Sequence, residues 1–269
     1  MTLLTENRID RTFQRLRNKK EKALIPYIMA GDPSLEMTEK FVLALETGGA
    51  DLVEIGVPFT DPLADGPVIQ KAAGRGLKNK TTLSGIFQTV KRLREQTEIP
   101  IILMSYYNPI FRYGEERFLA HARQSGVDGV IIPDLPAGES HSWESFAKKE
   151  NIKTIFLLAP TSSESRIKKV AGASSGFIYY VALTGITGAK LTIGKEIEKR
   201  IKKIRKHSSL PVAVGFGISN PREAREISRN ADGIIVGSAI VKRIEEDPHP
   251  SVCSSLTNFI RSLKKSLLK

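Results

Sequence analysis

Short apolar runs recur eight times along this chain, and stretches with helical spacing separate them. The runs are ALIPYIM from 23, DLVEIGV from 51, PIILMSY from 100, DGVIIPD from 128, KTIFLLA from 153, GFIYYVA from 176, PVAVGFG from 211 and DGIIVGS from 232. Strands that alternate with helices form parallel sheets, because a parallel pair needs a long crossover connection. Eight such units predict a closed (β/α)8 barrel, a TIM barrel, that occupies residues 1–269 as a single domain. An open, doubly wound sheet is the alternative; the similar openings GGADLVEI, SGVDGVII and RNADGIIV favour repeated units and therefore the barrel.

The stretches between the runs predict amphipathic helices. EMTEKFVLALETGG and GEERFLAHARQSG are two examples, and Gly126 at the end of the second is a typical helix C-cap. The spacing of Leu3, Leu4, Ile9, Phe13 and Leu16 predicts an extra N-terminal helix that covers another part of the protein. The second and third runs start 49 residues apart, and the sixth and seventh 35. This spacing predicts long loops after strands two and six, at the C-terminal mouth of the barrel, where active-site loops are built.

Composition narrows the classes of protein to which the chain can belong. The net charge is +12, which allows nucleic-acid binding as an alternative, but the basic residues lie in predicted helices, interleaved with apolar residues as on a solvated face. One cysteine excludes an intrachain disulfide and a cysteine-based metal site. No run approaches 18 apolar residues, and the N-terminus has no apolar signal region. We therefore expect a cytoplasmic protein that binds neither membranes nor nucleic acids.

An acidic residue interrupts the second apolar run. In the alternation of a strand, Leu52 and Glu54 share one face, while Val53, Ile55 and Val57 form an apolar face suited to packing against helices. Glu54 therefore points into the barrel near the end of its strand. Desolvation there raises the pKa of a carboxyl group toward neutrality, which suits a general acid or base. The alternative is a structural glutamate paired with backbone or a lysine.

The loop after this strand carries two more acids. Asp61 and Asp65 lie between Pro58, Pro62 and Pro67, which restrict the loop. Because a stiff loop can hold a carboxylate at the mouth without a metal, we favour a catalytic role for Asp65. Asp61, in the sequence TDP, fits a turn cap equally well.

Glycines follow the last two strands. VGFGIS (214–219) leaves strand seven, VGSAIV (236–241) leaves strand eight, and GITG (185–188) adds flexible backbone. Phosphate binding at a short helix after strands seven and eight recurs in barrels, and Ser238 is placed to cap such a helix. Plain turn glycines are the alternative.

Large apolar side chains mark several strand ends. An aromatic substrate fits among them, although core filling is the preferred interpretation for any single one. They are Tyr27, Met104, Tyr106, Phe156, Tyr179 and Phe216. The four histidines lack the spacing of metal ligands, so no metal site is expected. No lysine lies in the middle of a predicted strand, which argues against Schiff-base chemistry.

The motifs together resemble the family of tryptophan synthase alpha subunits. They run through residues 23–243 in the family's order. They are PYIMAGDP (26–33), DLVEIGVPFTDPLADGPVIQ (51–70), MSYYNPIFRYG (104–114), PDLP (133–136), YYVALTGITGA (179–189), VGFGIS and VGSAIV.

The resemblance implies a TIM barrel that cleaves indole-3-glycerol phosphate into indole and glyceraldehyde 3-phosphate by a retro-aldol reaction without a cofactor of its own. It implies that Glu54 is the general acid/base that protonates indole C3, and that Asp65 accepts a hydrogen bond from indole N1–H. Substrate contacts would come from Tyr27, Met104, Tyr106, Tyr179, Thr187 and Phe216. The phosphate would lie against Gly188, Gly217, Gly237 and Ser238.

The resemblance also implies a partner, a pyridoxal-phosphate-dependent beta subunit that receives the indole within an alpha2beta2 heterotetramer. Asp61, Asn108, Pro109 and Pro136 would face that subunit, so a partner role for Asp61 becomes preferable to a turn cap. The chain departs from the family at Thr60, where serine is common, and at Ala182 and Leu183, where polar side chains are common. The departures at Ala182 and Leu183 affect the details of loop closure rather than the reaction.

Three alternatives remain open at this point. The first is a non-catalytic alpha-like subunit that only activates a beta subunit; intact Glu54 and Asp65 argue against it. The second keeps the barrel and phosphate site but acts on another phosphorylated small molecule. The third is the nucleic-acid binder, which predicts salt-sensitive retention of DNA or RNA.

Overall fold

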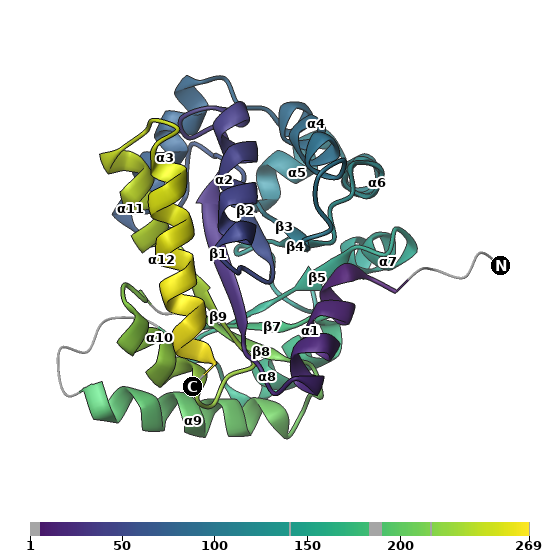
Figure 1. Cartoon of the computed structure of the whole chain (residues 1–269). Coiled ribbons are helices and arrows are strands. Elements are labelled where there is room, and N and C mark those ends of the chain that lie inside the picture. Colours follow the sequence, from purple (N-terminus) through teal and green to yellow (C-terminus); the bar gives the residue numbers. More distant parts are fainter. Residues whose placement is uncertain (1–5, 140, 183–189, 216, 269) are drawn as a thin grey trace.

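Nine parallel strands form one closed sheet in the computed structural model, which describes residues 6–139, 141–182, 190–215 and 217–268 (Figure 1). The strands are β1 (Ala23–Met29), β2 (Val53–Gly56), β3 (Ile101–Met104), β4 (Gly129–Ile131), β5 (Lys153–Ile155), β6 (Leu157–Leu158), β7 (Ile178–Val181), β8 (Val212–Gly215) and β9 (Gly233–Val236). Their order is β5-β4-β3-β2-β1-β9-β8-β7-β6. Because only Phe156 separates β5 from β6 in the chain, the two ends of the sheet meet and the barrel is closed. The predicted barrel is confirmed, with its fifth run divided into two short strands.

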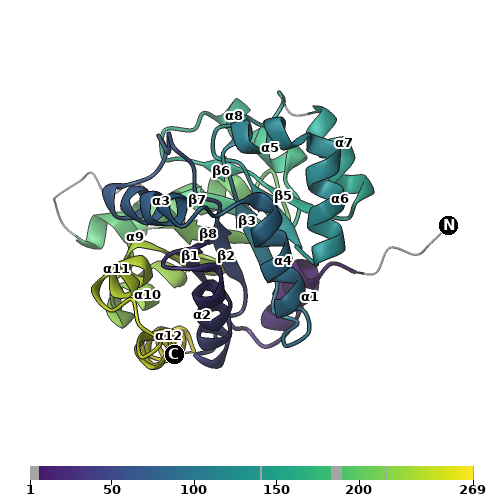
Figure 2. The same cartoon turned by 90° about the horizontal axis from the view of Figure 1, so that it is seen from above.

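Helices surround the strands when the molecule is viewed from above (Figure 2). They are α1 (Arg8–Asn18), α2 (Leu35–Thr47), α3 (Pro67–Lys78), α4 (Leu83–Leu93), α5 (Tyr107–Tyr113), α6 (Glu115–Ser125), α7 (His141–Lys149), α8 (Glu164–Ala173), α9 (Lys190–Arg205), α10 (Pro221–Ser228), α11 (Ser238–Glu246) and α12 (Val252–Leu267). The two helices predicted in detail are confirmed as α2 and α6. Gly126 ends α6 with a left-handed φ of 92°, as a C-cap glycine does.

Side chains alternate between two apolar clusters on the two faces of the sheet. Val53 and Ile55 belong to the cluster that the outer helices cover, whereas Leu52 belongs to the cluster inside the barrel. The inner cluster also contains one face of α1, formed by Ile9 and Phe13 with Leu16. The predicted N-terminal helix therefore closes the end of the barrel at which the strands begin. Leu3 and Leu4 lie outside the described residues.

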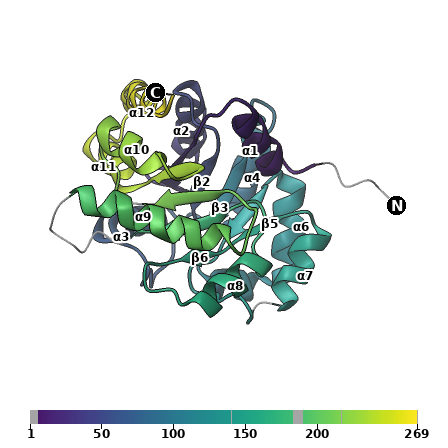
Figure 3. The same cartoon turned by 90° about the horizontal axis from the view of Figure 1, so that it is seen from below.

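The connection after β2 contains more than a loop. Residues 57–66 form the loop, and α3 follows as a complete helix before α4. The connection after β7 falls largely outside the described residues, and the long helix α9 follows it along one side of the barrel (Figure 3). The extra length predicted after strand two is confirmed, and much of it is helical.

The repeated Gly/Asp openings of the strands have a common geometry. In each, an aspartate just before a strand exchanges hydrogen bonds with one residue of the neighbouring strand: its backbone N–H donates to that residue's carbonyl, and its carboxylate accepts from that residue's N–H. All six N–O distances are 2.9 Å. The pairs are Asp51 with Leu24, Asp128 with Ile101, and Asp232 with Val212. The sequence repeat is thus a structural device at the strand starts.

Candidate active site

Glu54 lies on the inner face of β2. It follows Leu52 by two residues, so the two side chains point to the same side of the sheet. Its side chain is buried, with 1% of the residue exposed, and neither carboxyl oxygen has a hydrogen-bond partner among the described residues. Burial, with a smaller contribution from the negative charge of Asp65, raises the pKa of Glu54 to about 8. A buried, unpaired carboxyl group is costly for the folded state, and at neutral pH this one holds a proton that it can give up.

Asp65 lies in the loop that follows β2, and Tyr106 holds it there. The Tyr106 hydroxyl donates to Oδ2 of Asp65 over 3.2 Å and accepts from the backbone N–H of Ala64 over 2.8 Å. Burial raises the pKa of Asp65 to about 6, and the hydrogen bond from Tyr106 opposes that rise. The loop and the strand thus present two carboxyl groups with different pKa values, as acid–base sites commonly do.

Two tyrosines flank Glu54 on the inner face of the sheet. Tyr27 of β1 is paired in register with Glu54, and Tyr179 of β7 is close enough for the charge of Glu54 to affect its pKa. Burial is the largest cause of the raised pKa of each phenol, and the carboxyl groups of Glu54 and Asp65 add to it. Both hydroxyl groups therefore stay protonated and can act as hydrogen-bond donors at the barrel mouth.

Two strand glycines make room for these phenols, and sequence reasoning did not assign them to the site. A Cβ atom on Gly56 would lie 2.0 Å from the Tyr27 hydroxyl oxygen, and one on Gly215 would lie 2.6 Å from that of Tyr179. No side chain larger than hydrogen fits at either position without moving a tyrosine. The available signal was a glycine inside an apolar strand, which commonly marks a close approach.

The other apolar candidates fall on different sides of the sheet. Met104 contacts apolar clusters inside the barrel and at its mouth, and Tyr106 packs against Phe59 with ring centroids 5.3 Å apart. Phe156 is buried in the outer cluster, so core filling is confirmed for this residue. It lies on the opposite face because it separates β5 from β6 and alternates with the inward-facing Ile155 and Leu157. Phe216 and Thr187 lie outside the described residues.

The glycines after β8 and β9 lie at the same end of the barrel. Gly237 is the N-cap of α11, and a Cβ atom there would be 3.5 Å from Cβ of Tyr27. Ser238 is exposed and is the first residue of α11; its predicted capping role is wrong, because the N-cap is Gly237 and no side chain of the described residues caps the helix. The N–H groups of the first turn of a helix have no acceptor within it and are suited to an anion. Gly217 is exposed near this end, and Gly188 lies outside the described residues.

The four residues predicted to face a partner lie on neighbouring loops. Asp61 is exposed in the loop after β2 and accepts a 2.6 Å hydrogen bond from Thr60; Asn108 is exposed at the start of α5. The neighbouring Tyr107 N–H donates to Asp134 over 2.9 Å, which ties α5 to the loop that contains Pro136. Pro109 and Pro136 are half-buried. Two large apolar side chains are exposed close to these residues in the sequence: Leu63 in the loop after β2, with 92% of its surface exposed, and Phe111 of α5, with 64%.

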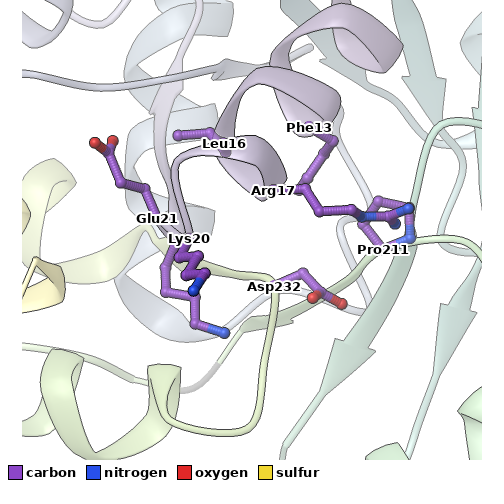
Figure 4. A pocket seen from close by; sticks show the side chains of 8 residues that line it. Phe13, Leu16, Arg17, Lys20, Glu21, Pro211 and Asp232 are labelled. Carbon is purple, nitrogen blue, oxygen red and sulfur yellow. The ribbon is translucent and has the colours of Figure 1, made fainter.

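A pocket of about 190 Å³ opens at the opposite end of the barrel, beside the last turn of α1 (Figure 4). Its lining residues are Phe13, Leu16, Arg17, Lys20, Glu21, Lys22, Pro211 and Asp232. Its two acids already have cationic partners, because Asp232 binds Arg205 at 3.1 Å and Glu21 is 3.9 Å from Lys264. The pocket lies where the strands start and is therefore remote from Glu54.

The described residues contain no group of three or more His, Cys, Asp and Glu side chains placed to hold a metal ion. Among the helices described, none has the length and apolar character needed to cross a membrane.

Comparison with known proteins gives one consistent family. A sequence profile of the family described as tryptophan synthase alpha chain matches residues 13–267. The alpha chain of Geotalea uraniireducens is 52% identical over 258 residues, covering 96% of this chain and 97% of that one. The alpha chain of Geotalea daltonii is 50% identical over 260 residues, covering 97% and 98%. The crystal structure of tryptophan synthase subunit alpha from Legionella pneumophila superposes with a TM-score of 0.91 at 35% identity and covers 98% of this chain and 99% of that chain.

Proposed function

This chain belongs to the tryptophan synthase alpha-chain family, and on that premise we propose that Glu54 and Asp65 carry out its reaction. It is the alpha subunit, a carbon–carbon lyase of tryptophan biosynthesis that cleaves indole-3-glycerol phosphate into indole and glyceraldehyde 3-phosphate. The observation that carries the assignment of residues is the buried Glu54 carboxyl group at the barrel mouth, without a partner among the described side chains and beside Asp65.

The proposed chemistry moves one proton from a hydroxyl group to a carbon atom. Glu54 donates its proton to indole C3, which makes the ring an electron-accepting cation at N1. Asp65, ionised above a pKa of about 6, accepts the hydrogen bond from N1–H and stabilises that charge. Glu54, now a carboxylate, takes the proton of the hydroxyl on the adjacent side-chain carbon. The C–C bond breaks, an aldehyde forms, the bonding electrons return to the indole ring, and Glu54 ends as it began.

The substrate is proposed to lie across the barrel mouth. Its indole ring would contact Tyr27, Met104, Tyr106, Tyr179 and Phe216, with Thr187 contacting Asp65 when the loop after β7 closes. Its phosphate would accept hydrogen bonds at Gly188, Gly217, Gly237 and Ser238. The start of α11 supports this placement, since it has no side-chain cap among the described residues and the N-terminus of a helix favours an anion.

An alpha chain of this family works with a beta subunit. We propose an alpha2beta2 heterotetramer in which the beta subunit carries pyridoxal phosphate, this chain carries no cofactor, and indole passes between the two. Asp61, Asn108, Pro109 and Pro136 would face the beta subunit. The proposal extends to a cytoplasmic location and to a single domain that spans residues 1–269.

Indole release from indole-3-glycerol phosphate by the purified chain, with and without a beta subunit, tests the function. Glu54→Gln should reduce kcat by about 10²–10⁴-fold, because it removes the proton donor and keeps the shape. Circular dichroism of both proteins checks that the fold is retained. Full activity in Glu54→Gln would refute the assignment of Glu54. A chain that stimulates the beta subunit but never cleaves the substrate would instead be the non-catalytic alpha-like subunit.

Substitutions of Asp65 and of Asp61 should affect different properties in the same assay. Asp65→Asn removes the charge at indole N1, so kcat should fall with or without the beta subunit. Asp61→Asn should leave cleavage by the isolated chain unchanged and reduce its stimulation by the beta subunit. Equal behaviour of the two variants would contradict the division of this loop into a catalytic and a partner-facing part.

A further inference from the structure

Two helices that each begin near the proposed site lie side by side. α3 begins directly after the loop that holds Asp65, and α11 begins at the proposed phosphate position (Figure 1). Their contact is apolar and close: Ala72 and Ala73 of α3 and Val241 of α11 belong to one buried cluster with Tyr27. The placement of one helix against the other therefore sets the distance between the carboxyl groups and the phosphate position.

One guanidinium group connects these helices with the end of β1. Arg75 of α3 binds both carboxylate oxygens of Asp32, over 2.7 and 2.8 Å, and binds Glu245 of α11 over 2.9 Å. Asp32 lies in the loop after β1 and is 3% exposed. A planar guanidinium can bind two carboxylates at fixed angles at once, which a lysine cannot do.

The C-terminal half of α3 is fixed to that loop by contacts besides the ion pair. A Cβ atom on Gly76 would lie 2.7 Å from the carbonyl oxygen of Ala30, so helix and loop are in direct backbone contact. The Asn79 side-chain amide donates to the carbonyl oxygen of Gly31 over 3.1 Å and also to that of Pro33. Because these contacts join α3 to the loop after β1, the ion pair of Arg75 with Glu245 connects α11 to that loop as well.

We infer that Arg75 is a positioning residue that, through Glu245, holds the N-terminus of α11 where the substrate phosphate binds. This inference rests on the proposed function. Seven residues separate Ser238 from Glu245, about 10 Å along the helix, so a shift at Glu245 is transmitted by a rigid helix to the N–H groups of its first turn. Those groups bind an anion well only when all of them point at it, and small displacements weaken binding.

The test compares Glu245→Gln with Glu246→Gln. Both remove one negative charge from the last turn of α11, but Glu246 is exposed, and its ion pair among the described residues is with Lys242 of its own helix, at 3.8 Å. Glu245→Gln should raise KM for indole-3-glycerol phosphate about three- to tenfold and leave kcat within about twofold, because the phosphate is remote from the breaking bond. It should weaken inhibition by inorganic phosphate by the same factor. Glu246→Gln should match the wild type in all three values.

A stability measurement separates positioning from a purely structural role. Glu245 is partly exposed, so its loss should change the melting temperature only slightly, whereas Arg75→Lys should lower it because Asp32 is buried. An unchanged KM and unchanged phosphate inhibition in Glu245→Gln would overturn the inference, whatever happens to the melting temperature. The affinity of the wild type and of Glu245→Gln for inorganic phosphate, measured by calorimetry, tests the inference without an activity assay. If the wild type releases no indole, that result refutes only the proposed function.

Discussion

Glu54 and Asp65 show how position along one strand and its loop sets the chemistry of two similar residues. Glu54 follows the alternation of β2 into a dry interior, so its carboxyl group loses solvation and gains no partner among the described residues. Asp65 lies in the loop that follows β2, where Tyr106 holds its carboxylate in a partly buried position. Burial raises both pKa values, but only Asp65 has a hydrogen bond that favours its charged form.

The pH dependence of cleavage should report these two groups. Asp65 must be ionised to stabilise the indole cation, so kcat/KM should fall as the pH drops below about 6. Glu54 must be protonated to donate to indole C3, so kcat/KM should fall as the pH rises above about 8. The two carboxyl groups interact, so the limbs of the bell-shaped profile belong to the pair. A flat profile between pH 5 and 9 would contradict the assignment, and an acidic limb that persists in Asp65→Asn would show that another group causes it.

Glu54 should also make the folded protein less stable as the pH rises. Its pKa of about 8 in the folded state lies above the 4.5 of an exposed glutamate, so between these values the folded state binds more protons than the unfolded state. Stability contributed by this group is therefore present below pH 4.5 and is lost as the pH rises through 8. Glu54→Gln cannot ionise and should raise the free energy of unfolding by up to about 5 kcal/mol at pH 9 relative to the wild type, with a difference below about 1 kcal/mol at pH 5. Urea denaturation at the two pH values measures this; an equal effect at both would indicate a packing change instead.

At the scale of elements, the three aspartates before β2, β4 and β9 should differ in their contribution to stability. Each carboxylate also binds a basic side chain, and the exposed fraction of the carboxylate is 3% for Asp128, 6% for Asp51 and 33% for Asp232. Removing one partner of a buried pair leaves an uncompensated charge, which costs about 3–5 kcal/mol, whereas an exposed pair contributes at most about 1 kcal/mol. We expect the loss of unfolding free energy to rank Asp128→Ala, then Asp51→Ala, then Asp232→Ala. Denaturant titration of the three variants checks the order, and three equal losses would show that the shared backbone hydrogen bonds dominate.

The elements also show which parts of the fold a sequence can specify. Period-two alternation placed Val53 and Ile55 outside and Leu52 inside, because the strand is buried on both faces and a one-residue slip would reverse every side chain. The division of the fifth run at Phe156 has no comparable local signal, since it depends on where the two neighbouring strands end. The predicted capping role of Ser238 is wrong for a similar reason. Serine favours the N-cap position, but in this fold Gly237, the single residue between β9 and α11, is the N-cap.

Tertiary contacts account for the parts of the candidate site that the sequence did not show. Glu54 and Asp65 stand out because acids are unusual in an apolar strand and in a proline-rich loop. Gly56, a glycine inside an apolar strand, signals a close approach, but the group that approaches it, the hydroxyl of Tyr27 on the adjacent strand, is known only from the fold. The contact of Arg75 with Glu245 joins residues 170 positions apart, and no local pattern predicts it.

At the scale of the whole molecule, the two ends of the barrel have different tasks. One end is closed by α1 and by ion pairs of the aspartates that precede the strands, so its residues serve stability. The other end carries the unpaired Glu54, the loop of Asp65 and the uncapped start of α11. This division is typical of barrel enzymes, in which loops at the C-terminal ends of the strands vary without disturbing the core.

The same end exposes an apolar surface that a partner should cover. Phe111 on α5 has 64% of its surface exposed, close in sequence to Asn108 and Pro109 of the proposed partner-facing surface. Large aromatic side chains at the centre of an interface often contribute 2 kcal/mol or more to binding. Phe111→Asp should therefore weaken binding to the beta subunit by about tenfold or more and leave cleavage by the isolated chain within about twofold of the wild type. Leu268→Asp is the matched control, because Leu268 is 55% exposed but lies near the opposite end of the barrel. It follows α12, whose Lys264 donates to the carbonyl oxygen of Lys22, the residue before β1. Titration calorimetry with the beta subunit measures both variants; equal affinities would place the partner on another face of the barrel.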